Sequence, residues 1–253
     1  MQSKSIGVLG GGAWGTGLAQ ALANGGHKVQ MWALEPEVKD SVNNEHENKR
    51  YLPGYKLSPN LTVSNDIIEV ATDKEFLIVA SPSLYLASTI RKITSVPNVA
   101  DGTTIFAALT KGFVPGRDGP KLVLETIENT LPGIYKGNTV YVAGPSHAEE
   151  VVMGKITGLV AASENPKNSI KVRELLRVPG ILCYSSFDVI GVQICSAAKN
   201  VVAVVYGALD AVAQHSQIFG DNTESLLLAA GLNEIQTLGM AMGATHSETF
   251  TSI

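Results

Sequence analysis

Short apolar runs alternate with helical patterns through the first two-thirds of the chain. The runs with the length and β-branched content of strands cover residues 5–9, 28–32, 61–64, 75–81, 103–107, 139–143, 158–162 and 181–185. Helical patterns follow most of these runs, at residues 14–24, 37–43, 66–71, 84–95, 120–130, 148–153 and 167–177. This alternation predicts an α/β fold with a doubly wound, mainly parallel sheet that has helices on both faces.

The pattern changes after residue 188. Only Lys199 is charged between residues 189 and 209, and this stretch is rich in Ala and Val and contains no proline. It is typical of a long helix that is buried on most sides, and residues 223–243 form a second helical pattern. We therefore expect an α/β domain over residues 1–188 and an all-helical domain over residues 189–253. No uncharged apolar run reaches about 18 residues, so no transmembrane helix is expected.

Composition narrows the class of protein. The 253 residues include 19 Lys or Arg and 23 Asp or Glu, and the resulting net charge of −4 argues against a nucleic-acid partner, which normally requires a basic surface. Charged residues make up only 17% of the chain. Part of the surface is therefore expected to be covered by another domain or subunit, and a homodimer is the expected assembly.

Cysteine and histidine usage favours a reducing compartment and gives no sign of a metal centre. Cys183 and Cys195 lie in apolar stretches and are too few for a disulfide framework. The five histidines are scattered without zinc-site spacing, so no metal is expected. Residues 5–9 are too short for the apolar core of a signal peptide. The expected location is the cytoplasm.

A glycine-rich turn follows the first apolar run. Gly10, Gly12 and Gly15 form the pattern G-x-G-x-x-G immediately before a helical pattern. In this context the first glycine permits a tight turn, the second lets the backbone approach a pyrophosphate, and the third lets the helix pack on its strand. The start of the helix adds free N–H groups and the positive end of its dipole. The pattern predicts a Rossmann-type dinucleotide site, and a plain glycine turn is the alternative.

An acidic residue stands where such a site needs one for the ribose hydroxyls. Glu35 lies 20 residues after Gly15, just past the second apolar run. Its carboxylate would repel a 2′-phosphate, and neighbouring Leu34 supplies no positive charge to bind one. NAD is therefore favoured as the cofactor, and NADP stays open.

Lys199 is the residue that most strongly suggests catalysis. An ammonium group inside an apolar helix costs several kcal/mol unless it is paired or functional. Burial would favour the neutral amine, and an enzyme that reduces a ketone with a nicotinamide needs a group that gives a proton to the carbonyl oxygen. Asn200 follows directly and is expected to bind substrate or to orient the lysine. The alternative is a lysine that extends from the helix into solvent.

Two further segments follow predicted strands at their carboxyl ends, where doubly wound sheets bind ligands. Lys111 follows the run 103–107, and it is either a ligand-binding cation or a solvated loop residue. Gly144 and Ser146 follow the run 139–143, just before a helical pattern. Ser146 has the position of an N-cap, which would by itself explain the serine, and open N–H groups there would suit an anion.

Several segments together resemble the NAD(P)-dependent glycerol-3-phosphate dehydrogenases of the bacterial type. They occur in the family's order along the whole chain: GGGAWGTGLA at 10–19, NKRYLPG at 48–54, VASPS at 79–83, LTKGF at 109–113, GPSHAE at 144–149, AKNVV at 198–202, and residues 231–234 with 243–250. The resemblance implies a reversible interconversion of sn-glycerol 3-phosphate and dihydroxyacetone phosphate, which supplies glycerol 3-phosphate for phospholipid synthesis.

The resemblance also implies roles for single residues. Lys199 matches the proton acceptor and donor of the family, and Lys111 matches a lysine that touches cofactor and substrate. Gly144, Ser146 and Asn200 fall in the segments that bind substrate. The positions implied as cofactor contacts are Gly10, Gly12, Ala13, Trp14, Gly15, Leu34, Glu35, Ser81, Pro82, Lys111 and Ala148.

The chain departs from the family in two places. Ala230 stands where the family usually has an arginine. After Thr249 and Phe250 the family continues with a Gly-Asp-Leu segment and an Arg-Asn pair, which supply a substrate-binding aspartate and groups that grip the phosphate, whereas this sequence stops at Ile253. We expect the sequence to be part of a longer protein, and the alternative is a form without this part of the substrate clamp.

Two other functions remain open on the sequence. One is a different dehydrogenase with a Rossmann domain and a helical domain, of the β-hydroxyacid type, since such enzymes also place a lysine beside an asparagine on a buried helix. The Lys111 loop and residues 144–148 favour the phosphate-specific enzyme over it. The other is an NAD-binding sensor or a catalytically impaired paralogue, which would bind NAD without turning over dihydroxyacetone phosphate.

Overall fold

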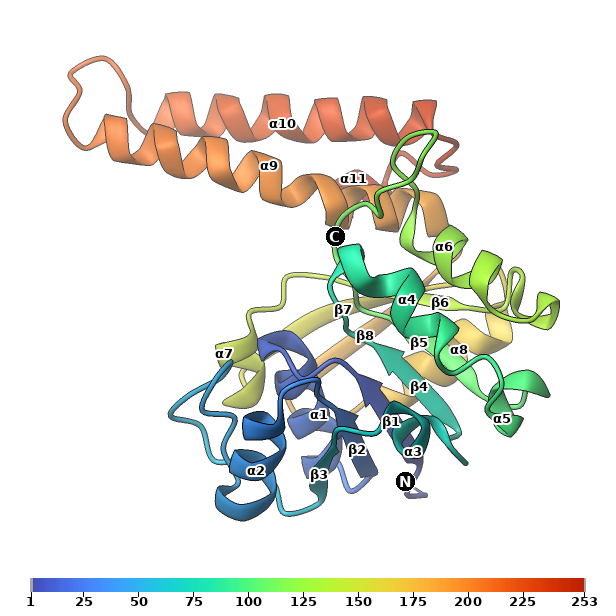
Figure 1. Ribbon diagram of the computed structural model, residues 1–253. Helices are drawn as coiled ribbons and strands as arrows, with labels where there is room; N and C mark the ends of the chain where they lie inside the picture. Colours follow the sequence, from blue (N-terminus) through green and yellow to red (C-terminus); the bar gives the residue numbers. More distant parts are fainter. Residues whose placement is uncertain (1, 253) are drawn as a thin grey trace.

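The computed structural model describes residues 2–252. Within them, an eight-stranded sheet of order β3-β2-β1-β4-β5-β6-β7-β8 forms the centre of the molecule (Figure 1). The strands are β1 (Ser5–Leu9), β2 (Lys28–Trp32), β3 (Leu61–Ser64), β4 (Phe76–Val79), β5 (Ile105–Ala108), β6 (Val140–Ala143), β7 (Thr157–Ala162) and β8 (Ile181–Ser186). Strands β1 to β6 run parallel, and the expected doubly wound, mainly parallel sheet is confirmed.

Helices cover both faces of the sheet. One face carries α1 (Ala13–Asn24), α2 (Pro36–Glu45), α7 (Ala148–Val152) and α8 (Pro166–Leu175), and the other carries α3 (Ile67–Ala71), α4 (Leu86–Arg91), α5 (Pro97–Ala100) and α6 (Val123–Thr130). Alternate strand residues enter the two cores: Ile78 packs under α1, whereas Leu77 and Val79 pack on the opposite side. Burial on both faces explains why β4 is an unbroken apolar run.

The helix expected at 84–95 is shorter than predicted. A 3-10 turn (Ser83–Tyr85) precedes α4, which ends at Arg91. The chain then forms α5, a single turn that the sequence analysis does not predict. Pro97 occupies the first position of α5, where a proline fits because its missing N–H has no helical partner to lose.

The sheet changes direction at β7, which pairs antiparallel with β6 and parallel with β8. The end of β8 therefore lies level with the start of β6: the Ser163 amide that follows β7 bonds the Ser186 carbonyl, and the Ser163 hydroxyl bonds the Thr139 carbonyl. The next helix, α9 (Val189–Ala213), begins at this amino-terminal edge of the sheet. It passes over β6 toward the opposite edge, where the first six strands end (Figure 1).

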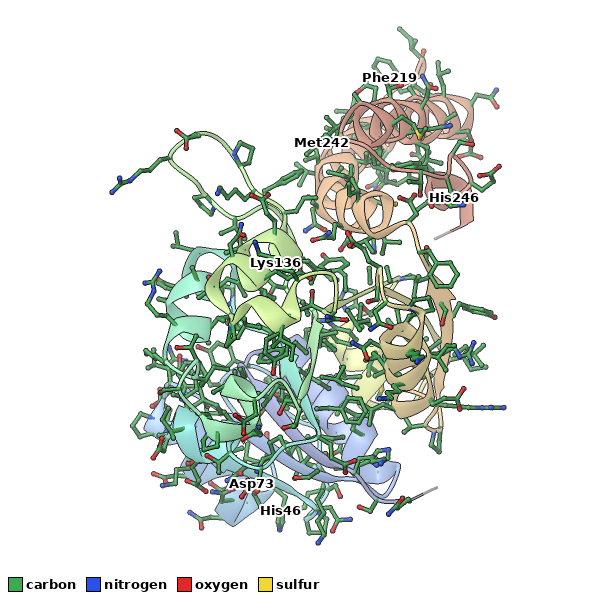
Figure 2. All side chains as sticks on the ribbon, turned by 90° about the vertical axis from the view of Figure 1, so that its right-hand side faces the viewer. His46, Asp73, Lys136, Phe219, Met242 and His246 are labelled. Atoms are coloured by element: carbon green, nitrogen blue, oxygen red, sulfur yellow. The ribbon has the colours of Figure 1, made fainter. Side chains whose placement is uncertain are left out.

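Helix α9 and helix α10 (Asp221–Ala241) form a hairpin that projects beyond the sheet, and α11 (Thr249–Ser252) packs back on α9. Figure 2 shows Phe219 and Met242 on this helical part, with His46 and Asp73 at the opposite end of the molecule. The expectation that α9 is buried on most sides is wrong, because its buried residues are Gly191 to Cys195 alone. An apolar composition makes a helix easy to bury, but it does not say which faces the neighbouring elements cover.

Helix α9 is the segment that bears on the expectation of no transmembrane helix. Its mean hydropathy reaches 1.6 over 18 residues, so among the described residues it has the length and composition to cross a bilayer. Core helices pass the same test, and the first turns of α9 place Val192 in the core beneath α6. This single apolar helix is therefore weak support for a membrane span.

A buried carboxylate joins the helical part to the sheet. Asp188 caps α9 by accepting a hydrogen bond from the Gly191 amide (3.1 Å), and it also accepts bonds from the Thr245 amide (3.0 Å) and the Thr249 hydroxyl (2.7 Å). Burial alone would raise the pKa of Asp188, but these hydrogen bonds outweigh it and hold the pKa below its ordinary value. One side chain thus fastens both ends of the helical hairpin.

Candidate functional site

The glycine turn joins β1 to α1 at the carboxyl edge of the sheet. Gly10 has a φ of 141°, and a Cβ on it would lie 2.7 Å from the carbonyl carbon of Ala80. A Cβ on Gly15 would collide with the Gly10 carbonyl oxygen, whereas one on Gly12 would meet nothing within 4 Å. The first and third glycines therefore keep the turn tight, and the second faces open space through which a phosphate can approach.

The start of α1 is open to an anion. Gly12 is its N-cap, no side chain caps the helix, and its first turn contains no acidic residue. The free N–H groups and the positive dipole end therefore face the same side as the open backbone at Gly12. Ala13 and Trp14, both expected to contact the cofactor, are the first two residues of this helix.

A buried amide holds the turn from beneath. Asn48, which is fully buried, donates from Nδ2 to the Gly11 carbonyl (2.9 Å) and to the Thr16 hydroxyl (2.7 Å). Its Oδ1 accepts a hydrogen bond from the Tyr51 amide at 3.1 Å. These side-chain hydrogen bonds of Asn48 thus fix both the glycine turn and the loop that carries Tyr51.

Glu35 stands beside the turn as the N-cap residue of α2. Its Oε1 accepts a hydrogen bond of 2.6 Å from the Tyr51 hydroxyl, and this bond, together with burial, raises the pKa of Tyr51. Arg50 lies over the Tyr51 ring, 5.3 Å from its centroid, and pairs with Glu37. The neighbouring Leu34 is exposed. The Arg50 guanidinium therefore lies close to Glu35, the residue expected to bind the ribose. The sequence-based expectation considered positive charge only at position 34.

Ser81 follows β4 at the point where the strand order reverses between β1 and β4. Its buried hydroxyl has no hydrogen-bond partner among the described residues, and its carbonyl accepts a bond from the Thr110 hydroxyl (2.8 Å). Pro82 is exposed beside it. An unpartnered buried hydroxyl, an open helix start and a glycine cradle at one switch point fit a dinucleotide.

Two lysines from different elements meet in one pocket of about 520 Å³, which is also lined by Gly144, Pro145 and Ser196. Lys111 comes from the loop after β5, and Lys199 comes from α9. The Lys111 Nζ lies 6.0 Å from the centroid of the Trp14 ring. Lys111 thus connects the glycine turn with the pocket.

Lys111 is the more buried of the two lysines. Lys199 is exposed, so the expectation that its ammonium lies inside an apolar helix is wrong. Burial lowers the pKa of Lys111, and the positive charge of Lys199 lowers it further. Asn200 is exposed and is not among the residues that line the pocket. Two converging ammonium groups suit an anionic substrate such as a phosphate ester.

The segment after β6 forms another wall of the pocket. Gly144 has a φ of 151°, and a Cβ on it would collide with the Gly158 carbonyl oxygen, so only glycine fits there. The N-cap role considered for Ser146 is wrong, because His147 is the N-cap of α7 and the Ser146 hydroxyl instead donates to the Gly144 carbonyl at 3.3 Å. Ala148 opens α7 and lies against α1, since a Cβ on Gly17 would be 3.1 Å from its carbonyl oxygen.

The sequence analysis assigned no role to Asn48, Tyr51, Tyr141 or Ser196. The first two lie in the segment NKRYLPG, so a search of that segment for buried polar residues would have found them. Ser196 lies one helical turn before Lys199, a spacing that signals a shared face. Tyr141 is separated from Ser196 by 55 residues, and no local pattern connects them.

Comparison with known proteins gives one consistent result. Residues 5–169 match the family described as NAD-dependent glycerol-3-phosphate dehydrogenase N-terminus, and residues 188–253 match the corresponding C-terminus. Glycerol-3-phosphate dehydrogenase [NAD(P)+] of Treponema denticola is 54% identical over 257 residues, which cover 99% of this chain and 72% of the relative. The enzyme of the same name from Bacillus velezensis is 36% identical over 240 residues, which cover 95% of this chain and 67% of that relative.

Solved structures agree with these relatives. The crystal structure of glycerol-3-phosphate dehydrogenase from Coxiella burnetii superposes with a TM-score of 0.86 at 30% sequence identity. The match covers 99% of this chain and 72% of that chain.

Proposed function

The chain belongs to the NAD-dependent glycerol-3-phosphate dehydrogenase family, and we propose that the pocket between Lys111 and Lys199 is where it interconverts sn-glycerol 3-phosphate and dihydroxyacetone phosphate with NAD(P). The observation that carries this proposal is the position of Lys111, which lies over Trp14 of the glycine turn and also lines the pocket that contains Lys199. A group in that position can bring cofactor and substrate together.

Each part of the site has a task in the reaction. The open backbone at Gly12 and the start of α1 hold the pyrophosphate, and Glu35 binds the ribose hydroxyls. When bound, NAD(P) supplies or accepts the hydride. The Lys111 ammonium attracts the phosphate-bearing substrate. Ser146 and Asn200 remain predicted substrate contacts, and Ala13, Leu34, Ser81, Pro82 and Ala148 remain predicted cofactor contacts.

Lys199 is the proposed general acid and base. In the reducing direction, the carbonyl carbon of dihydroxyacetone phosphate gains the hydride, and the carbonyl oxygen takes a proton from the Lys199 ammonium. The ketone becomes a secondary alcohol, and the neutral amine regains its proton from water. In the oxidising direction, the amine removes the hydroxyl proton as the hydride leaves carbon.

The choice of NAD over NADP is proposed from the Glu35 carboxylate. Tyr51 holds this carboxylate in place, and a negative charge there disfavours the 2′-phosphate of NADP. Arg50 acts in the opposite sense, since its guanidinium lies in the same cluster and can attract a phosphate. NAD is favoured because Arg50 already has an acidic partner in Glu37.

The setting proposed for this reaction is the cytoplasm, where the product would supply phospholipid synthesis. Two domains, 1–188 and 189–253, are supported by the start of α9 at Val189 and by the separate family matches to the two parts. A homodimer is supported by the low content of charge and by exposed apolar side chains of the hairpin, such as Val204 and Leu226. Sedimentation velocity tests the assembly.

The reaction is tested by NADH oxidation in the presence of dihydroxyacetone phosphate. Lys199→Ala is expected to lower kcat by about a hundredfold to ten-thousandfold without changing the Kd for NADH. Lys39→Ala, on the outer surface of α2, is the matched control and should behave as the parent. Activity that survives unchanged in Lys199→Ala would contradict the catalytic role of Lys199. A parent chain that binds NADH without turnover would favour a sensor or a chain without part of the substrate clamp, and turnover of a β-hydroxyacid alone would favour the other dehydrogenase class.

A further inference from the structure

Tyr141 is a fully buried tyrosine on β6, the strand whose last residue, Ala143, lines the pocket. Its hydroxyl lies 3.0 Å from the Thr110 carbonyl oxygen and 3.2 Å from the Ser196 Oγ. Thr110 precedes Lys111, and Ser196 lies three residues before Lys199 on α9. One phenol therefore touches the backbone next to the first lysine and the helical turn next to the second.

The chemistry of the three groups fixes the direction of both hydrogen bonds. A carbonyl oxygen can only accept, so the single phenol proton of Tyr141 goes to the Thr110 carbonyl. The Ser196 hydroxyl then donates its own proton to the Tyr141 oxygen. Burial raises the pKa of Tyr141 to about 12, so the phenol keeps its proton and this arrangement holds throughout the neutral range.

The network continues to the cofactor side of the site. The Thr110 hydroxyl donates to the Ser81 carbonyl, so the residue that Tyr141 holds is also attached to the loop that follows β4. Tyr141 thus sits at the junction of the strand end at Ser81, the loop of Lys111 and helix α9. A buried network whose members are all satisfied gives its atoms one arrangement.

We propose that Tyr141 is a positioning residue that sets the relative placement of Lys111 and Lys199 in the pocket. This role rests on the proposed function of the two lysines, and Tyr141 itself touches neither substrate nor cofactor. Without the bond between Tyr141 and Ser196, α9 would shift and misplace Lys199, while the nucleotide cradle would stay intact. A displacement of about 1 Å in an active site can lower a rate by about a hundredfold.

The chain offers a matched control for removal of the Tyr141 hydroxyl. Tyr135 is also buried, burial likewise raises its pKa to about 12, and its hydroxyl has no hydrogen-bond partner among the described residues. Tyr141→Phe and Tyr135→Phe therefore remove the same atom from two buried sites, but only the first breaks the link between the lysines. Ser196→Ala removes only the hydrogen bond between Tyr141 and α9 and keeps the bond from Tyr141 to the Thr110 carbonyl.

In the kinetic arm of the test, Tyr141→Phe should lower kcat for dihydroxyacetone phosphate by about tenfold to a hundredfold, with the Kd for NADH changed by less than about twofold. Ser196→Ala should lower kcat in the same direction, and the double variant should be no worse than Tyr141→Phe, since both act through one link. Tyr135→Phe should match the parent. An unchanged kcat in Tyr141→Phe, or additive losses in the double variant, overturns the proposal.

A second arm needs no turnover and so separates this proposal from the proposed function. Difluorodinitrobenzene joins two amines only when they lie close together, and mass spectrometry measures the yield of the Lys111–Lys199 cross-link. The yield should fall severalfold in Tyr141→Phe and stay at the parent level in Tyr135→Phe. A parent without the cross-link, or an unchanged yield in Tyr141→Phe, overturns the placement role even if the enzyme is active. A cross-link that forms in the parent and falls in Tyr141→Phe supports the placement role even without turnover, and a lack of turnover bears on the proposed function alone.

Discussion

The Asn48 amide donates a 2.9 Å hydrogen bond to the carbonyl of Gly11, across 37 residues of sequence, and thereby fixes the orientation of the glycine turn. Asn48→Ala removes the shorter buried hydrogen bond from that carbonyl and the bond to the Thr16 hydroxyl, at a cost of about 1–3 kcal/mol. We expect the Kd for NADH, measured by fluorescence titration, to rise by about tenfold.

Asn43→Ala serves as the control for this change. Asn43 makes two hydrogen bonds of similar length to the backbone of Val63, away from the turn. It should lower the melting temperature without weakening NADH binding. Equal losses of NADH affinity in the two variants would show that Asn48 acts through general stability.

The glycines of the turn should respond differently to a methyl group. Gly12→Ala adds a Cβ into open space, so the protein should fold normally but lose affinity for NADH, since the methyl occupies the approach path of the phosphates. Gly15→Ala forces a collision with the Gly10 carbonyl and should lower the melting temperature as well. Thermal melts and NADH titrations of both variants measure the contrast, and tight NADH binding by Gly12→Ala would contradict a phosphate path at this position.

The carboxylate of Glu35 should control the choice of cofactor. Glu35→Gln removes the charge that disfavours a 2′-phosphate, so the attraction of the nearby Arg50 guanidinium for that phosphate is no longer opposed. The ratio of kcat/KM for NADPH to that for NADH should rise by about tenfold. Glu45, at the end of α2, is exposed and pairs with Lys49 of the following turn, so Glu45→Gln should leave the ratio unchanged. A parent that already prefers NADPH would refute the argument from Glu35.

Asp188 should make the helical part sensitive to acid. Its pKa is lower in the folded protein than in the unfolded chain, so its stabilisation is present above the unfolded pKa of about 3.9 and is lost as the pH falls through the folded value. Asp188→Asn should reduce the free energy of unfolding by about 1–3 kcal/mol at pH 7, and the gap to the parent should shrink in acid. Urea unfolding of the parent and the variant at pH 7 and in acid measures this difference in the free energy of unfolding.

Asp66→Asn is the comparison for this prediction. Asp66 also caps a helix, but α3 is short, and among the described residues the Asp66 carboxylate accepts bonds from the Ile68 and Glu69 amides of that helix alone. Its loss should be smaller than that of Asp188→Asn. A similar loss in both variants would mean that the bonds from Thr245 and Thr249 add nothing to a simple cap.

Sequence reasoning succeeds where the determinant is local. The tight turn at Gly10 and Gly15 follows from the spacing of three residues, because backbone geometry there admits no Cβ. The strands follow from apolar runs such as β4, since burial on both faces allows no polar residue. The family resemblance likewise implies one site for Lys111 and Lys199, and both lysines line one pocket.

It fails where the determinant is the arrangement of distant segments. The exposure of Lys199 depends on which faces of α9 the neighbours cover, and composition does not carry that information. Ser146 has the residue type and position of a cap, but the helix begins one residue later, and boundaries of this kind are fixed by tertiary contacts. The Tyr141–Ser196 contact joins a strand to a helix 55 residues later, and no periodicity reveals it.

Because the strand direction reverses at β7, the number of residues in α9 before Lys199 determines where that lysine lies. Since the helix starts at one edge of the sheet and Lys199 is needed at the other, the ten helical steps from Val189 to Lys199 must span about 15 Å, which is close to the length of β6. Inserting one residue in this interval would rotate Lys199 by about 100° around the helix axis and move it out of the pocket. The number of residues between the cap and the lysine is therefore as much a part of the site as the lysine's own chemistry.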